Sequence, residues 1–480
     1  MNRRMVLYVV GKVVMVEGGL MLLPLITALL YREAVAASIA ASIAVALVSG
    51  FLITKISRPG LKTIYAKEGF VITALSWFAL SAVGALPFFF SREIPSYIDA
   101  FFETVSGLTT TGASILTDVE SMSKGLLMWR SFTHWVGGMG VLVFMMAIIP
   151  SISDRSIHLL RAEVPGPVVG KLVPKIRQTS RILYVIYIAI TLIEVVFLLF
   201  GGMSLFESLI HAFGTAGTGG FGIKATGIGG YSPYIQWVIT VFMLIFGVNF
   251  NLYYLLLLKK IKSVFKSSEL WVYVSIVAVS VILICFNIAP LYETLSETVR
   301  HSFFQVSSII TTTGYATADF NLWPNFSKLI LLLLMFIGGC AGSTAGGIKV
   351  ARVVMLYKII KTELQRMLHP RSVKVSRFEG KCLDSSTLSS VNSYLAVYTM
   401  LFCVFVFIIG FNGFDIETTV SAVSACFNNI GPAFGIAGPV GSYASFSVFS
   451  KIVLSMAMLF GRLEIYPIIL TLSASTWAKK

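Results

Sequence analysis

Four short segments of this chain share one arrangement of small polar residues and glycine. They contain the sequences Thr109-Thr110-Thr111-Gly112-Ala113-Ser114, Ala216-Gly217-Thr218-Gly219-Gly220-Phe221, Thr311-Thr312-Thr313-Gly314-Tyr315-Ala316 and Asn428-Asn429-Ile430-Gly431-Pro432-Ala433. Such turns can present rings of backbone carbonyl oxygens, which replace the hydration shell of a cation, and Thr-x-Gly-Tyr loops are the potassium version of this filter. Glycine allows the φ values that point the carbonyls inward. The repeated motif therefore predicts a cation filter.

The filter prediction depends on the recurrence of the motif, because one copy could equally be a helix C-terminus capped by glycine. We align the glycines as Gly112, Gly219, Gly314 and Gly431. The predicted filter residues are Thr110, Thr111, Gly112, Thr218, Gly219, Thr312, Thr313, Gly314, Asn429, Ile430 and Gly431. The four turns are unequal, since only Gly314-Tyr315 approaches the potassium-channel signature and the fourth turn has no threonine before its glycine. We expect K⁺ and Rb⁺ to permeate, with some Na⁺.

The elements that must position these turns are membrane spans. The chain has 480 residues, of which 56% are hydrophobic and 12% charged, whereas soluble proteins carry about 25% charged residues. This composition excludes a soluble enzyme, and we find no catalytic constellation, disulfide framework or metal-ligand cluster. Apolar stretches long enough to span a bilayer are predicted at 5–30, 34–54, 68–90, 124–150, 181–200, 233–258, 269–289, 327–348, 388–410 and 445–474.

Half-length apolar stretches lie between these spans and end at the glycine turns. They occupy 98–110, 205–217, 299–312 and 416–429, and they are too short to cross the bilayer, so each must enter and return on one side. A second glycine recurs in the following span, at Gly137, Gly247, Gly338 and Gly461. The repeat predicts an all-α polytopic membrane protein with four helix–pore-helix–helix repeats around one pseudo-fourfold pore, preceded by two extra transmembrane helices. The predicted segments are 1–66 for the leading helices and 67–180, 181–268, 269–387 and 388–480 for the four repeats.

The net charge of +15 reports topology, because the basic residues concentrate in alternate connections. By the positive-inside rule these connections and both termini are cytoplasmic. We therefore expect no nucleic-acid partner.

A glycine-rich segment follows the third filter turn. Its residues of interest are Gly338, Gly339, Gly342, Ser343, Thr344, Gly346 and Gly347. Each glycine costs a helix about 1 kcal/mol relative to alanine, which favours an intramembrane loop beside a cavity. Close helix packing through Gly-x-x-x-Gly spacing fits the composition equally well.

Two arginines lie within predicted spans. Arg462 is near the middle of its span, where a charge is costly. It either faces the cavity below the filter, where it would limit cation flux, or forms a buried ion pair; Glu464 is on another face of the helix. Arg130, nearer the outer end of its span, is interpreted as a packing or snorkelling residue.

These motifs together resemble the Trk/Ktr/HKT family of potassium transporters over essentially the whole chain. The chain is similar to the TrkH-type potassium-uptake subunit in three features. These are the two leading helices, the sequence Glu163-Val164-Pro165-Gly166-Pro167 and the sequence Ile176-Arg177-Gln178-Thr179. The resemblance implies inward conduction of K⁺ as the permeant ligand without an organic cofactor, a homodimer in the lipid of a prokaryotic plasma membrane, and a loop at 338–347 that moves during gating. It also implies a cytoplasmic TrkA-type nucleotide-binding regulatory ring, which would dock on the basic connections 151–180 and 349–387.

Two other functions remain open at this stage. A Na⁺- or H⁺-coupled K⁺ symporter would use intramembrane carboxylates, for which Glu17 and Glu194 are the candidates. A membrane sensor that does not transport would use the basic connections to bind partners or anionic lipid, but the four filter turns would then have no role.

Overall fold

The protein is almost entirely helical. The computed structural model describes residues 1–60, 64–140, 176–369, 377–379, 381–383 and 385–478. The described strands are β1 (Arg377–Phe378) and β2 (Lys381–Cys382), which pair antiparallel.

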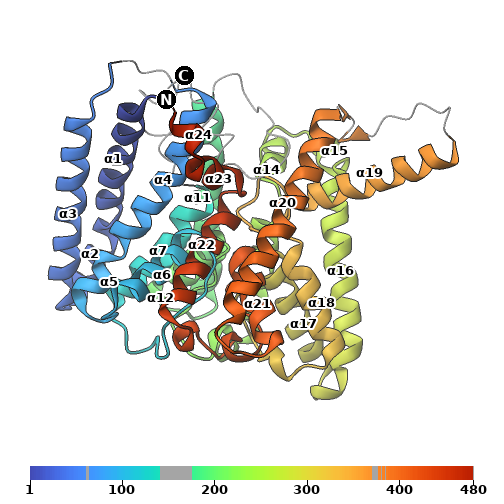
Figure 1. Ribbon diagram of the computed structural model, residues 1–480. Coiled ribbons are helices and arrows are strands. Elements are labelled where there is room, and N and C mark those ends of the chain that lie inside the picture. Colours follow the sequence, from blue (N-terminus) through green and yellow to red (C-terminus); the bar gives the residue numbers. More distant parts are fainter. Residues whose placement is uncertain (61–63, 141–175, 370–376, 380, 384, 479–480) are drawn as a thin grey trace.

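The chain begins with two helical spans that lie beside the repeats, at the left of Figure 1. The first is formed by α1 (Arg3–Leu20) and α2 (Leu22–Leu30), and the second is α3 (Val35–Ile56). The helices α1 and α3 approach closely at Gly11 and Gly50, where a Cβ on Gly50 would lie 2.7 Å from the carbonyl oxygen of Gly11.

Four helix–pore-helix–helix repeats follow, as the sequence predicts. The first contains α4 (Ala66–Gly84), the short α5 (Leu86–Ser91), the pore helix α6 (Tyr97–Leu108) and α7 (Lys124–Gly138). The second contains α11 (Ile176–Phe200), the pore helix α12 (Leu205–Ala216) and α13 (Pro233–Phe246). The third contains α16 (Ser268–Ile288), the pore helix α17 (Leu295–Ile310) and α18 (Asn325–Phe336). The fourth contains α20 (Ser385–Gly410), the pore helix α21 (Ile416–Phe427) and α22 (Val448–Arg462).

Each pore helix begins at a polar N-cap residue whose side chain accepts a hydrogen bond from a backbone N–H in the first turn. The caps are Ser96, Ser204, Thr294 and Asp415. At the fourth cap, hydrogen bonds from the Thr418 hydroxyl and backbone N–H lower the pKa of the Asp415 carboxyl. Each pore helix therefore begins at its cap and ends at its filter turn.

The second helix of every repeat ends close to its recurrent glycine. The helix α7 ends at Gly138, α13 ends just before Gly247, α18 ends at Phe336 and α22 ends at Arg462. Two of them continue after a sharp bend. The helix α14 (Phe250–Leu257) follows α13 at 90°, and α23 (Tyr466–Leu472) follows α22 at 120°.

Several of the ten predicted spans are therefore not single straight helices. Six helices in the described residues are long and apolar enough to cross a membrane, and the two bent pairs raise that number to eight. The predicted span 327–348 is helical only to Phe336, because its second half forms a loop. The predicted span 124–150 extends beyond residue 140, outside the described residues.

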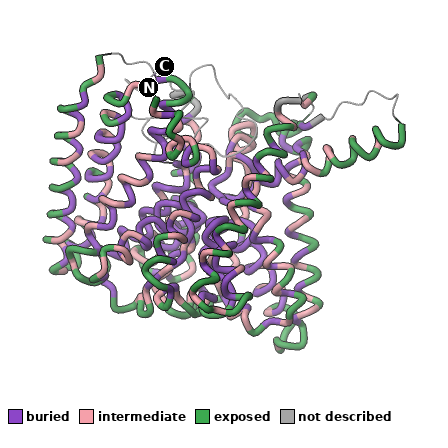
Figure 2. The backbone as a smooth tube through the Cα atoms, in the orientation of Figure 1, coloured by how far each residue is buried: buried purple, intermediate pink, exposed green. Residues whose placement is uncertain are grey.

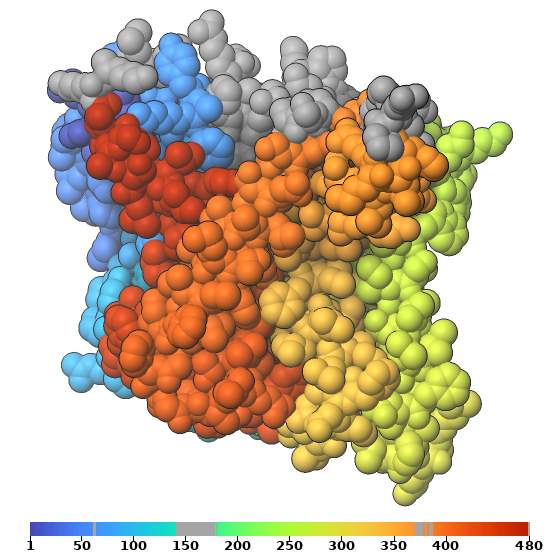
Figure 3. All heavy atoms as spheres, turned by 45° about the vertical axis from the view of Figure 1, so that its right-hand side comes forward, coloured from blue at the N-terminus to red at the C-terminus, as the bar shows by residue number. Residues whose placement is uncertain are grey.

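Both termini lie at one face of the molecule, which we call the terminal face, at the top of Figure 1. The short helices α15 (Ile261–Phe265) and α24 (Ala474–Trp477) lie on this side, and α19 (Val350–Leu368) projects from it. The pore helices lie in the opposite half of the molecule. Buried residues gather around the centre, between the four repeats, whereas α3 and α16 are largely exposed on their outward sides (Figure 2). The third and fourth repeats lie side by side over one surface of the molecule (Figure 3).

Candidate functional site

The four pore helices end in the same backbone turn. In all four repeats, one residue of the turn donates its backbone N–H to the carbonyl five residues earlier, at 2.8 Å. These donors are Thr111, Gly219, Thr313 and Ile430. The residues just before them are left-handed, with φ of 57°, 54°, 56° and 57° at Thr110, Thr218, Thr312 and Asn429. This is a Schellman cap in which threonine or asparagine stands where glycine is usual, at a cost of roughly 1–2 kcal/mol per residue.

A second positive φ follows two residues later and is occupied by glycine in every repeat. These residues are Gly112, Gly220, Gly314 and Gly431, with φ of 80°, 76°, 83° and 98°. The alignment of Gly219 with the other three filter glycines is therefore wrong by one position. Gly220 is the equivalent glycine, and Gly219 occupies the place of Thr111, Thr313 and Ile430.

The four glycines and the carbonyls before them form a closed ring. A Cβ on Gly112 would overlap the carbonyl oxygen of Gly219, and one on Gly220 would overlap that of Thr313. A Cβ on Gly314 would overlap the carbonyl oxygen of Ile430, and one on Gly431 would lie 2.6 Å from that of Thr111. Each repeat thus meets the next, and the fourth meets the first. A side chain at any of these glycines would displace a carbonyl of the neighbouring repeat.

The irregular second repeat is explained by His134 of α7. A Cβ on Gly219 would overlap the His134 ring, whose Nδ1 is hydrogen-bonded to the Gly107 carbonyl at 2.8 Å. The imidazole therefore occupies space that a threonine side chain would need, and the chain uses Gly219 there. His134 was not among the residues predicted from the sequence, because nothing in the local pattern of α7 indicates that it reaches a turn of the next repeat.

Side-chain hydrogen bonds support the turns from behind. The Thr109 and Thr111 hydroxyls are 2.8 Å apart, and the Thr311 and Thr313 hydroxyls are also 2.8 Å apart. The amide nitrogen of Asn429 donates to the Thr111 hydroxyl at 2.9 Å, which links the fourth repeat to the first. The ring is therefore held by polar contacts within and between repeats.

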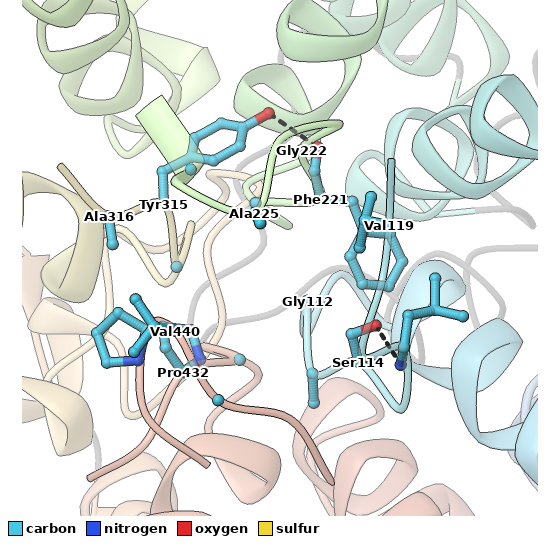
Figure 4. A pocket seen from close by; sticks show the side chains of 18 of the residues that line it. Gly112, Ser114, Val119, Phe221, Gly222, Ala225, Tyr315, Ala316, Pro432 and Val440 are labelled. Carbon is cyan, nitrogen blue, oxygen red and sulfur yellow. Dashed lines mark hydrogen bonds between the residues drawn. The ribbon is translucent and has the colours of Figure 1, made fainter. Parts of the chain in front are cut away.

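A cavity of about 160 Å³ opens on the side of the ring away from the terminal face. All four repeats line it, including Gly112, Gly220, Gly314 and Gly431. Figure 4 shows Ser114, Phe221, Tyr315 and Pro432 arranged around it, with the Tyr315 hydroxyl directed at the backbone of the second repeat. That hydroxyl donates to the Phe221 carbonyl at 3.2 Å. Groups from all four repeats thus surround this cavity.

The glycine-rich segment between α18 and α19 is a loop, which agrees with the loop interpretation and not with packing of a continuous helix. It reaches the terminal side of the filter turns. The backbone N–H of Gly346 donates to the Thr312 hydroxyl at 2.7 Å, and a Cβ on Gly346 would lie 2.5 Å from the Asn428 carbonyl oxygen. The loop therefore contacts the third and fourth repeats at the base of the filter.

Both ends of this loop are anchored by one carboxylate. Glu269, in the first turn of α16, accepts hydrogen bonds through Oε1 from the backbone N–H of Ala341 at 2.6 Å and of Ala351 at 3.1 Å. The loop is also tied to the second repeat, because Cys340 donates its N–H to the Gly247 carbonyl at 2.9 Å. Sequence analysis did not select Glu269, since a lone acid at a helix start resembles an ordinary first-turn residue.

Arg462 lies at the centre of this arrangement. Its guanidinium donates to the carbonyls of Gly137 and Gly138 at 2.5 and 2.7 Å, and to the Thr344 carbonyl of the loop at 2.9 Å. Glu464 pairs instead with Arg352, at 2.6 Å. The guanidinium thus joins the end of α7 to the glycine-rich loop.

Of the two interpretations of Arg130, packing agrees with the structure and snorkelling is wrong. Arg130 is 3% exposed, and its Nε lies 2.6 Å from Oε1 of Glu103 on the first pore helix. The side chain is thus held inside the protein by its ion pair, at the edge of the cavity that it helps to line, and does not extend to a membrane surface.

The fold and the filter together define a polytopic membrane protein with pore loops. Residues 32–479 match the family model TrkH, described as a cation transport protein. The chain is 35% identical to "Trk system potassium uptake protein TrkH" of Salmonella typhimurium and of Escherichia coli, over 99% of this chain and 100% of each relative. The crystal structure of the potassium transporter TrkH from Vibrio parahaemolyticus superposes with a TM-score of 0.89, at 31% identity and with full coverage of both chains. This chain belongs to the TrkH family of cation transport proteins.

Proposed function

We propose that this protein is the K⁺-translocating membrane subunit of a Trk-type uptake system, which conducts K⁺ and Rb⁺ and, less well, Na⁺. The observation that carries the proposal is the closed ring in which each filter glycine packs on a carbonyl of the next repeat. Carbonyl rings of this kind replace the hydration shell of a monovalent cation. The names of the similar proteins, which are Trk system potassium uptake proteins, support K⁺ as the permeant ion.

We further propose that the predicted filter residues bind the ion and that the loop 338–347 gates the path beneath them. The contact between Gly346 and Thr312 supports this role, because it puts the loop against the base of the filter. Arg462 would raise the energy of a cation at the same level, since the charge of its half-buried guanidinium repels a second positive charge. Movement of the loop would carry the Thr344 carbonyl away from Arg462.

The terminal face is proposed to be cytoplasmic, in a bacterial plasma membrane, and to carry the regulatory partner. The basic helices α15 and α19 and both termini lie on this side, as the positive-inside rule requires. A TrkA-type nucleotide-binding ring would dock there on a homodimer of this chain. The predicted docking stretch 151–180 lies mostly outside the described residues. The division into segments 1–66, 67–180, 181–268, 269–387 and 388–480 is part of the same proposal.

The test is uptake of ⁸⁶Rb⁺ into proteoliposomes that contain this subunit, with K⁺, Na⁺ and Li⁺ as competitors. We expect K⁺ to compete far better than Na⁺, and Gly314→Ser to reduce this preference because its side chain would displace the Ile430 carbonyl. Uptake that is indifferent to Gly314→Ser, with and without a TrkA-type partner, would contradict the filter.

A coupled symporter is the second candidate, and one observation favours it. Glu17 of α1 is 1% exposed, and neither carboxylate oxygen has a hydrogen-bond partner among the described residues. Buried intramembrane acids of this kind occur in proton relays. Rb⁺ uptake driven by an imposed H⁺ or Na⁺ gradient at zero Rb⁺ gradient, and lost in Glu17→Gln or Glu194→Gln, would favour coupling over conduction.

A further inference from the structure

Three of the four filter loops are held by their own pore helix through the same kind of hydrogen bond. In each case a pore-helix side chain accepts from the backbone N–H of the third residue after the filter glycine. Glu103 accepts from Ile115 at 3.0 Å, Gln305 from Thr317 at 3.4 Å, and Ser421 from Phe434 at 2.9 Å. We call this contact the pore-helix strap.

The second repeat lacks the strap. His211 lies nine residues before the filter glycine Gly220, as Glu103 and Gln305 do before theirs, whereas Ser421 lies ten residues before Gly431. The His211 Nδ1 is hydrogen-bonded to the Glu207 carbonyl. Its Nε2 is buried and has no hydrogen-bond partner among the described residues, although it faces the loop, 3.9 Å from where a Cβ on Gly222 would lie. The loop of the second repeat must therefore be positioned by other groups.

Tyr315 of the third repeat donates to the Phe221 carbonyl, and the neighbouring first repeat supplies two further groups from one face of α7. The Arg130 guanidinium lies 3.5 Å from the centre of the Phe221 ring and donates to the Gly222 carbonyl at 3.1 Å. One turn further along α7, the His134 ring also packs against the Phe221 ring, with centroids 4.1 Å apart. The spacing of four residues puts both side chains on the same face of the helix.

Glu103 couples this support to the first repeat. The same carboxylate that forms the strap to Ile115 also accepts from the Ser114 hydroxyl at 3.0 Å and from Arg130 Nε at 2.6 Å. Glu103 is 1% exposed and Arg130 3% exposed, so the pair is shielded from screening by water. A charge-assisted hydrogen bond of this length is stronger than the neutral straps of the other repeats.

Resting on the function proposed above, we propose that Arg130, held by Glu103, is a positioning residue that determines ion selectivity by fixing the filter loop of the second repeat. It acts through Phe221 and Gly222, which follow the filter glycine Gly220 directly. If Gly220 shifts, the ring opens at its contacts with Thr313, because the second and third repeats meet there. The carbonyl ring would then fit K⁺ less closely, and its preference for K⁺ over Na⁺ would fall.

The experiment compares Arg130→Lys, Arg130→Gln and Phe221→Leu with wild type, using Na⁺ and K⁺ competition of ⁸⁶Rb⁺ uptake. Lysine keeps the charge but lacks the planar fork that contacts Glu103 and Gly222 together. We expect the preference for K⁺ over Na⁺ to fall by about threefold to tenfold in all three variants, as for the loss of one or two hydrogen bonds. Lys124→Gln is the matched control, because it removes a charge from the same helix at an exposed site and should keep the wild-type preference.

A second variant guards against a folding defect. Arg130→Gln leaves Glu103 as an unpaired buried charge. The double variant Glu103→Gln/Arg130→Gln removes that charge and still lacks the contacts of Arg130 with Phe221 and Gly222. We expect this double variant to be folded and to show the same reduced preference. Variants that are folded and keep the wild-type K⁺/Na⁺ ratio, at any uptake rate, would overturn the proposal.

Failure of the proposed function can be told apart from failure of this inference. If wild-type protein takes up no Rb⁺ either alone or with a TrkA-type partner, the conduction proposal fails. The inference is then tested by thermal unfolding of purified protein in KCl and in NaCl, because a filter that binds K⁺ preferentially is stabilised by K⁺. A K⁺-specific stabilisation in wild type that persists unchanged in Arg130→Lys would still overturn it.

Discussion

The hydroxyl of Thr312 accepts a hydrogen bond, at 2.7 Å, from the backbone N–H of Gly346. Thr312 is the left-handed residue at the end of the third pore helix, and Gly346 belongs to the intramembrane loop. One hydrogen bond therefore joins the base of the filter to the segment beneath it, so the filter and the proposed gate are mechanically linked.

Removing this hydrogen bond should loosen the loop. In Thr312→Val the side chain keeps its shape but cannot accept, and a buried N–H without a partner costs about 1–3 kcal/mol. We expect faster ⁸⁶Rb⁺ uptake by the variant in proteoliposomes. Thr298→Val, the same change near the start of this pore helix, is the control and should leave the rate unchanged. A slower rate in folded Thr312→Val would contradict a restraining role.

Glu269 should restrain the same loop from its two ends. Glu269→Ala leaves the N–H groups of Ala341 and Ala351 without their shared acceptor, so we expect a more open loop and a lower melting temperature. Glu269→Gln keeps one carbonyl oxygen as an acceptor, so its uptake rate and melting temperature should lie between those of Glu269→Ala and wild type. Uptake rate and thermal unfolding measured on the same preparations check this order, and an alanine variant with wild-type values for both would refute it.

Neutralising Arg462 should increase cation flux. A unit charge several ångströms from a permeant ion changes its energy by about 2 kcal/mol at an effective dielectric constant near 20. We therefore expect Arg462→Gln to raise the initial rate of ⁸⁶Rb⁺ uptake by up to roughly thirtyfold, and Arg462→Lys to stay nearer to wild type. A glutamine variant that is folded and conducts at the wild-type rate would show that Arg462 is only a structural link between α7 and the loop.

Alanine variants of the two glycines in the second filter turn should differ in whether a second substitution, His134→Ala, restores uptake. Gly219→Ala would collide with the His134 ring, whereas Gly220→Ala would collide with the backbone carbonyl of Thr313. His134→Ala should therefore restore Rb⁺ uptake to Gly219→Ala but not to Gly220→Ala. Rescue of both glycine variants, or of neither, would argue against the assignment of Gly220 as the filter glycine. Uptake by the His134→Ala single variant provides the baseline.

Much of the fold follows directly from the sequence, because the information is local. A bilayer requires long apolar helices with internally satisfied backbones, so the spans, the half-length helices and the fourfold recurrence can be found from composition and spacing. The pore helices begin and end close to the predicted positions; α6, for example, occupies Tyr97–Leu108 against a predicted 98–110. Glycines at a tight turn are recognisable in the same way, since the φ of 76° to 98° at the filter glycines strongly favours glycine.

The sequence by itself thus determined the class of protein, the four repeats and the set of turns that we propose as the filter. Only the tertiary structure decided which glycine of the second turn belongs to the ring, because the deciding contact is with His134 of another repeat. The partners of Arg130, Glu269 and Arg462 were likewise settled by packing between segments far apart in the chain. A buried charge is stabilised by whichever donors or acceptors the fold brings within about 3 Å, and sequence spacing carries no record of them.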